Sequence, residues 1–90
     1  MKQVKFSLGL TVCTAAAMAE LEFPDMLLAL SRHATGDWGD LCAEDIYFNE
    51  LALIRGERLF SVYHSVKGVK FYVITEWNRS ATTILLPGDY

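Results

Sequence analysis

The sequence predicts one α+β domain, in which two or three helices pack on one face of an antiparallel sheet of three to four strands. Three observations predict this architecture. Residues 4–13 alternate between apolar and mostly polar side chains, which is the period of a half-buried strand. Residues 15–55 carry helical patterns with caps and stops at their ends. Residues 58–86 hold three short runs rich in β-branched and aromatic side chains.

Two short helices are expected in the first third of the chain. Thr14 is suited to cap a helix over residues 15–21, because its hydroxyl can accept from a free amide of the first turn. Phe23-Pro24 ends this helix, since the residue before proline is pushed out of helical geometry. Pro24 then suits the first turn of a second helix, which ends near His33.

A third helix is expected over residues 43–55, with two acids in its first turn and Gly56 as its stop. Apolar residues at helical spacing form a stripe along it, which comprises Tyr47, Leu51 and Ile54, widened by Phe48 and Ala52. We expect this stripe to face the core.

The last third of the chain predicts a meander of three strands. Residues 58–65 and 69–76 form the first two, and the short link over residues 66–68 indicates a hairpin. A second turn at residues 77–80 leads to the last strand at residues 82–86.

The N-terminal segment also resembles a secretory signal. Lys2 and Lys5 precede an uncharged run over residues 6–19, and Ala17-Met18-Ala19 resembles a cleavage site. The alternation of residues 4–13 favours a strand of the domain instead. No apolar stretch is long enough to span a bilayer, so we expect a cytoplasmic protein without a membrane partner.

The composition limits the possible functions. The 90 residues make one domain, residues 1–90, and 52% of them are hydrophobic, which is enough for a core. The net charge is −3 and the basic residues are dispersed, which argues against direct nucleic-acid binding. Cys13 and Cys42 lie in no zinc-binding motif, and there is no glycine-rich phosphate loop. We therefore expect no cofactor and no bound metal.

The densest cluster of polar residues surrounds the turn between the second and third predicted helices. It comprises Arg32, His33, Asp37, Trp38, Asp40, Glu44 and Asp45. One interpretation makes His33 and the three aspartates metal ligands, or an acid–base set around Trp38. The other makes the aspartates turn and cap residues, and places His33 at a helix end where the helix dipole favours it. The spacing matches no known metal loop, which favours the second interpretation.

The same region contains acids without bases. Residues 34–54 hold five acids and no lysine or arginine: Asp37, Asp40, Glu44, Asp45 and Glu50. This stretch is either an acidic face for a basic protein partner or a solvated helix face. Asp45 and Asn49 lie one helical turn apart, so they share a face and can tie the helix to a neighbouring loop.

A second polar group, Glu76, Arg79 and Ser80, surrounds the last predicted turn. Arg79 and Ser80 could bind a phosphate or a carboxylate. An ion pair between Arg79 and Glu76 that fixes the turn is the simpler interpretation. Ser80 has no surrounding nucleophile motif, and neither cysteine has a neighbouring base, so we assign no catalytic residue.

A longer motif runs through most of the chain. Arg32-His33-x-x-Gly36-Asp37-Trp38-Gly39-Asp40-Leu41 is followed by Glu44-Asp45-x-x-x-Asn49-Glu50-x-Ala52-Leu53, then by Ile74-Thr75-Glu76 and Arg79-Ser80-x-Thr82-Thr83-x-Leu85-Leu86-Pro87-x-x-Tyr90. In these residues the chain resembles a family of short proteins carried on bacterial plasmids and integrated mobile elements. Its members are often labelled plasmid-related proteins, or subunits of type I restriction enzymes. A methyltransferase subunit needs a cofactor fold several times longer than this chain, so the restriction label does not fit.

The resemblance implies a bacterial mobile element as the context, where small acidic proteins often block host defence systems or serve plasmid upkeep. We therefore expect a non-enzymatic accessory protein that binds another protein. Its most concrete version is a counter-defence inhibitor of a restriction or CRISPR component. One open alternative is a small metal-dependent hydrolase or ligand-binding protein that uses His33, Asp37 and Asp40. Another is an oligomerising accessory domain of plasmid maintenance. Exposed hydrophobic surface on a thin sheet would favour a symmetric homodimer, and an unpaired edge strand would help to form it.

Overall fold

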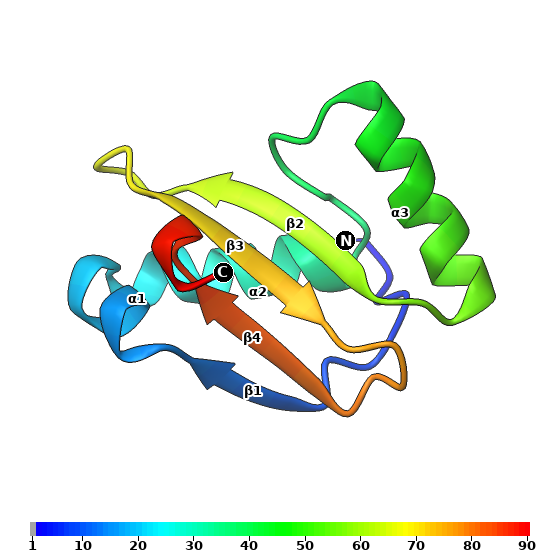
Figure 1. The fold of residues 1–90 in the computed structure, drawn as a ribbon, viewed down its shortest axis with the longest axis horizontal. Helices are drawn as coiled ribbons and strands as arrows, with labels where there is room; N and C mark the ends of the chain where they lie inside the picture. The colour runs from blue at the N-terminus through cyan, green and yellow to red at the C-terminus, as the bar shows by residue number, and fades with distance from the viewer. Residues whose placement is uncertain (1) are drawn as a thin grey trace.

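Four strands form a mixed sheet in the order β1-β4-β3-β2 (Figure 1). The computed structural model describes residues 2–90. The strands are β1 (Leu10–Cys13), β2 (Leu59–His64), β3 (Lys70–Thr75) and β4 (Ala81–Leu85). β2, β3 and β4 form the predicted antiparallel meander, whereas β1 runs parallel to β4. The predicted α+β class is confirmed, but the sheet is not purely antiparallel. Parallel neighbours need a long crossover, which the helices and strands between β1 and β4 supply.

The strand predicted over residues 4–13 is too long, because residues 4–9 lie outside the sheet. Gly9 has a φ of 65°, and a Cβ atom there would lie 2.4 Å from the carbonyl oxygens of Arg79 and Ser80. Only glycine combines that conformation with so close an approach. Before Gly9, the Lys5 amide donates to the carbonyl of Ala34 at 2.8 Å, so this segment crosses the end of the second helix.

The first two helices, α1 (Ala15–Glu20) and α2 (Phe23–Ala34), lie on one face of the sheet (Figure 1). The Thr14 hydroxyl accepts from the Ala17 amide at 3.1 Å, which confirms the predicted cap. Pro24 lies in the first turn of α2, also as predicted. The core between these helices and the sheet comprises Ala17, Leu21, Met26, Ala29, Tyr63, Phe71, Val73 and Ile84.

α3 (Ala43–Arg55) has its predicted bounds but does not lie on that face. It runs beside the outer edge of β2 (Figure 1). Its buried residues are Asn49 and Ala52. Ala52 packs with Trp38 and Leu59 in a second, smaller hydrophobic cluster.

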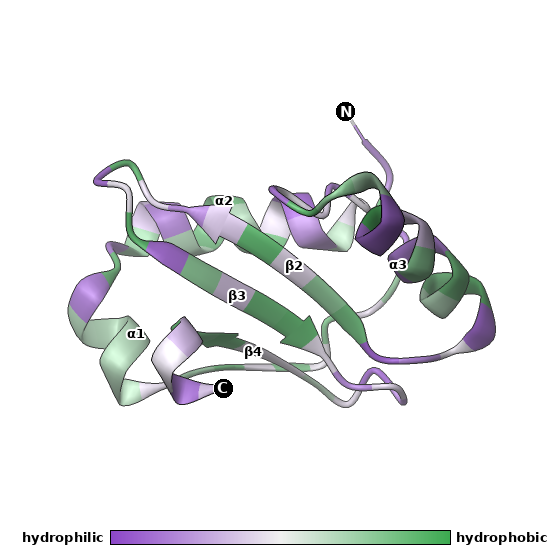
Figure 2. Ribbon diagram, turned by 45° about the horizontal axis from the view of Figure 1, so that its top comes forward, coloured by the Kyte–Doolittle hydropathy of each residue, from purple (hydrophilic) through white to green (hydrophobic). Residues whose placement is uncertain are grey.

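Most of the apolar stripe of α3 that was predicted to face the core faces solvent instead. Tyr47 is 59% exposed and Ile54 is 82% exposed. Figure 2 shows apolar residues along α3 as well as in the strands. The prediction is right for Ala52 but wrong for Tyr47, Phe48 and Ile54, because α3 contacts the sheet edge through Asn49 and Ala52, on the side of the helix away from Tyr47 and Ile54.

Among residues 2–90, the second face of the sheet is covered by the C-terminal residues, which are the short helix η1 (Pro87–Asp89) and Tyr90 (Figure 1). Three aromatic rings meet there. The ring centroid of Phe60 lies 4.7 Å from that of Tyr72 and 6.0 Å from that of Tyr90. Over residues 2–90, no helix has the length and apolar character needed to cross a membrane.

Candidate functional site

His33 is fully buried and belongs to a chain of hydrogen bonds, which we call the His33 chain. Its Nδ1 lies 2.5 Å from the Ser61 hydroxyl, and its Nε2 lies 2.8 Å from the Thr75 hydroxyl. The Thr75 hydroxyl lies 2.7 Å from that of Thr82, which donates to the carbonyl of Leu8 at 2.7 Å. Both ring nitrogens of His33 are therefore bonded within the core.

The bond from Thr82 to the Leu8 carbonyl determines which group donates in each of the other hydrogen bonds of the His33 chain. Thr82 gives its one hydroxyl proton to the Leu8 carbonyl, so it must accept from Thr75. Thr75 must then accept from the Nε2–H group of His33, and Nδ1 accepts from Ser61. The imidazole is neutral in this arrangement. Burial is the main cause that lowers the pKa of His33 from 6.5 to about 4.

Arg32 and Asp37 hold the connector that follows α2. The Arg32 guanidinium donates to both carboxylate oxygens of Asp37, at 2.7 and 3.2 Å, and lies 4.7 Å over the Tyr63 ring. The bonds from Arg32 hold the pKa of Asp37 below its usual value. Asp37 also accepts from the Gly39 amide at 3.2 Å, so it has the turn role that the second interpretation gave it.

Trp38 and Asp40 lie along the outer edge of β2. Trp38 is 3% exposed, and its ring N–H donates to the Glu50 carboxylate at 2.5 Å. The Val62 amide donates to the Trp38 carbonyl, and the Asp40 amide donates to the Val62 carbonyl. The Asp40 carboxylate lies 2.7 Å from Nδ1 of His64. These residues therefore pair the connector with the edge strand.

The structure does not bring His33, Asp37 and Asp40 together. His33 bonds hydroxyl groups in the core, Asp37 bonds Arg32, and Asp40 bonds His64 at the surface. Within residues 2–90, no three His, Cys, Asp or Glu side chains lie close enough to share a metal ion.

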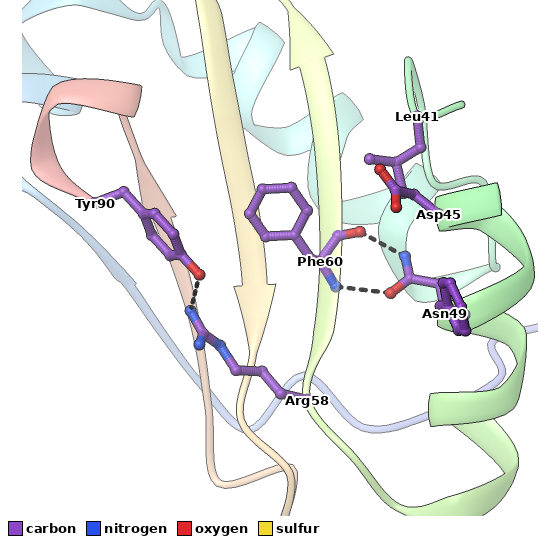
Figure 3. A pocket seen from close by; sticks show the side chains of 7 residues that line it. Leu41, Asp45, Asn49, Arg58, Phe60 and Tyr90 are labelled. Atoms are coloured by element: carbon purple, nitrogen blue, oxygen red, sulfur yellow. Dashed lines mark hydrogen bonds between the residues drawn. The ribbon is translucent and has the colours of Figure 1, made fainter. Parts of the chain in front are cut away.

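Asn49 ties α3 to the sheet. Its amide N–H donates to the Phe60 carbonyl at 2.5 Å, and its carbonyl oxygen accepts from the Phe60 amide at 3.2 Å (Figure 3). One side chain thus makes both bonds that a residue of a neighbouring strand would make. The predicted tie from Asp45 and Asn49 to a neighbouring loop is wrong in its partner, because Asn49 bonds strand β2 and Asp45 takes no part in these bonds.

Arg79 fixes the last turn and the end of α3 through carbonyl groups. It has a φ of 60°, and its guanidinium donates to the carbonyls of Glu57, Glu76 and Ala52 at 2.5, 3.2 and 3.4 Å. The predicted ion pair with the Glu76 carboxylate is not formed. Ser80 is exposed, and its carbonyl accepts from the Leu10 amide at 2.9 Å.

The outward side of α3 forms an exposed apolar surface with acids at its N-terminal end. We call it the α3 surface, and it comprises the exposed Tyr47, Phe48 and Ile54, the half-buried Leu51, and the exposed Glu44 and Asp45. The rings of Tyr47 and Phe48 contact each other edge to face, with centroids 5.8 Å apart. Contiguous exposed apolar residues with a polar rim are typical of protein-binding sites.

A groove of about 350 Å³ adjoins the α3 surface (Figure 3). Its lining residues come from the connector, α3, β2 and the C-terminus: Leu41, Asp45, Phe48, Asn49, Arg58, Phe60 and Tyr90. The Arg58 guanidinium donates to the Tyr90 hydroxyl at 3.2 Å and lies 5.4 Å from the centroid of its ring. Phe48 belongs to both the groove and the α3 surface, so the two form one continuous site.

Of the residues that the sequence singled out, this site contains Glu44, Asp45 and Asn49. Arg32, His33, Asp37, Trp38 and Arg79 hold the fold together elsewhere. Periodicity placed Tyr47 and Ile54 on one face of α3, but it predicted that this face meets the core. Arg58, Phe60 and Tyr90 were not predicted for the site, because only the folded chain brings them beside α3.

Neither the protein-family models, nor the curated proteins, nor the solved structures gave a match to this chain.

Proposed function

We propose that this protein is not an enzyme and acts by binding another protein through the α3 surface and the adjoining groove. The observation that carries the proposal is the exposed stripe of α3, in which Tyr47 and Ile54 are more than half exposed in spite of their helical periodicity. A stripe of this kind is suited to dock against an apolar segment of a partner.

Burial of the stripe would contribute substantially to binding. Covering the exposed parts of Tyr47, Phe48 and Ile54 contributes on the order of 1 to 2 kcal/mol for each side chain. Association costs a large part of such a sum, so the expected complex is specific but reversible. The groove above Phe60 would receive one apolar anchor side chain of the partner.

The charges of the site define the other part of the partner. Asp37 is paired with Arg32, Glu50 accepts from Trp38, and Asp40 lies against His64. The remaining acids of the predicted acidic stretch, Glu44 and Asp45, lie exposed in the first turn of α3. A lysine or arginine beside the apolar segment of the partner would complement them.

The resemblance to proteins of mobile elements supports a more specific proposal. In this proposal the chain is an accessory protein of such an element, and the partner is a component of a host defence system in the cytoplasm. The positions of β1 and Ala17 support a cytoplasmic location, because cleavage at the signal-like site would remove an edge strand and a core residue. The hydrolase alternative lacks such support, since both nitrogens of His33 are bonded to hydroxyl groups.

The test compares affinity capture from the host bacterium by three tagged proteins. These are the wild type, Tyr47→Ala/Ile54→Asp on α3, and Leu27→Asp/Leu28→Asp on the exposed side of α2. We expect the wild type and the α2 variant to retain the same partner and the α3 variant to lose it. Purified partner should then bind with an affinity that falls at least tenfold for Glu44→Lys/Asp45→Lys. Equal capture by all three proteins, or no specific partner, would contradict the proposal.

A further inference from the structure

The two edges of the sheet differ in how their backbone groups are satisfied. The outer edge of β2 is covered, because the connector bonds Val62 and the side chain of Asn49 bonds Phe60. β1 forms the opposite edge and has β4 as its one neighbour in the sheet. An uncovered edge presents a row of unpaired N–H and C=O groups to another strand.

The pairing of β1 with β4 shows which groups point outward. The Leu10 amide donates to the Ser80 carbonyl at 2.9 Å, and the Thr14 amide donates to the Ile84 carbonyl at 3.0 Å. Because N–H groups alternate along a strand, those of Thr11 and Cys13 point away from β4. The strand thus has a set of outward donors and acceptors with regular spacing.

Charge distinguishes this edge from the rest of the chain. Residues 6–19 contain no Asp, Glu, Lys, Arg or His, whereas the chain as a whole has a net charge of −3. Exposed edge strands usually carry charges that prevent pairing, and β1 has none. Leu10 is 69% exposed and Val12 is 40% exposed, on the sheet face opposite α1 and α2. The β1 strands of two copies therefore carry no like charges that would face each other in a pair, and the Asp89 carboxylate beside the end of β1 already accepts from the Thr14 hydroxyl at 2.7 Å.

We propose that β1 pairs antiparallel with β1 of a second copy, so that one continuous sheet crosses a two-fold axis. In one register the outward backbone groups of both Thr11 and Cys13 form hydrogen bonds. Thr11 then faces Cys13 of the second copy, and Val12 faces Val12 of the second copy on the two-fold axis. An axis at Thr11 would place Cys13 opposite Gly9, which the structure puts outside the strand. β1 and α3 lie at opposite edges of the sheet, so pairing through β1 does not involve the α3 surface (Figure 1).

The first test changes one outward N–H group. Thr11→Pro removes a donor that faces away from β4, and proline is tolerated at such an edge position. Thr11→Val keeps the N–H group and serves as the control. By sedimentation at about 100 µM, a concentration that would populate a dimer of micromolar Kd, wild type and Thr11→Val should have twice the mass of one chain. Thr11→Pro should have the mass of one chain. A wild type of single mass, or a dimeric Thr11→Pro, would overturn the proposal.

The second test examines the register by crosslinking. In a Cys13→Ala/Cys42→Ser background, Val12→Cys should form a disulfide-linked dimer on mild oxidation, since facing residues of a non-hydrogen-bonded pair lie about 4.5 Å apart. Leu10→Cys is the matched control, because it is more exposed on the same face. In this register the two Leu10 positions lie about 14 Å apart, from four steps of strand rise. Crosslinking of Leu10→Cys at the same rate, or none of Val12→Cys, would overturn the register.

Discussion

α2 and α3 are attached to the same sheet by different physical means. α2 lies on a face of the sheet and buries Met26, Ala29 and His33 against it. α3 lies beside an edge, where the amide of Asn49 bonds Phe60 and Ala52 packs on Trp38. The edge attachment uses a narrow side of the helix with small and polar residues. It therefore leaves the apolar stripe of α3 outside, where a partner can reach it.

The largest expected effect comes from removing the residue that α3 packs on. Trp38→Ala should lower the free energy of unfolding by about 3 to 5 kcal/mol, since a buried ring is lost and a cavity remains. Urea denaturation followed by circular dichroism measures the change. Trp77→Ala is the matched control, because Trp77 is 66% exposed in the last turn. Equal losses in the two variants would show that the α3 attachment does not depend on Trp38.

The attachment of α2 should weaken in mild acid. Above pH 6.5 the imidazole of His33 is neutral in both the folded and the unfolded chain. As the pH falls from 6.5 to about 4, the unfolded chain binds a proton that the folded chain does not, so stability is lost. The total loss from this residue is about 3 kcal/mol.

Urea denaturation at pH 7 and at pH 4 measures this loss. His33→Gln should flatten the pH dependence in that window, since glutamine keeps a donor and an acceptor but does not titrate. Because the bond from Arg32 lowers the pKa of Asp37, the stability that this carboxylate contributes is lost at lower pH than the contribution of His33. A wild-type slope that survives in His33→Gln would contradict the assignment to this residue.

A smaller effect is expected from the tie between α3 and β2. Asn49→Ala should cost about 1 to 3 kcal/mol, because it leaves both backbone groups of Phe60 without their partner. Hydrogen exchange of the Phe60 amide should accelerate with it. Asn78→Ala, at an exposed turn, provides the comparison within the same residue type. An unchanged exchange rate at Phe60 would show that another group holds the edge.

The smallest effect is expected on the stripe itself. Tyr47→Ala/Ile54→Asp should change the free energy of unfolding by no more than about 0.5 kcal/mol, since exposed side chains contribute little to stability. Met26→Ala on the buried side of α2 should cost about 2 to 5 kcal/mol in the same thermal or urea experiment. If both variants lose similar stability, the stripe of α3 belongs to the core.

Local patterns predicted the elements well, because caps and breakers act within a few residues. The bounds of α3, the cap at Thr14 and the meander after Gly56 all follow from such signals. The parallel pairing of β1 with β4 does not, since it joins residues about seventy positions apart. The same limit applies to Gly9, whose role depends on the distant carbonyls of Arg79 and Ser80.

The candidate site was harder to predict from sequence than the fold. Periodicity shows that Tyr47, Leu51 and Ile54 share a face, but it does not show whether that face meets its own core or another protein. Sequence also cannot separate a buried structural histidine from a ligand, because the hydrogen-bond partners of His33 lie on the distant strands β2 and β3. Tyr90 and Phe60 reach the groove only through folding, so no local pattern connects them.

The His33 chain has a consequence for how the sheet finds its register during folding. A slip of one residue along β3 would turn Thr75 to the other face and place Ile74 or Glu76 opposite the imidazole. The side chain of Ile74 could not accept from the ring N–H, and an ionised Glu76 carboxylate could accept but has no O–H group to donate to Thr82. Misaligned sheets of similar compactness are thereby penalised, whereas apolar packing alone would tolerate many of them. The hydrogen bonds of one neutral imidazole thus favour a single alignment of α2 with the strands β2 and β3.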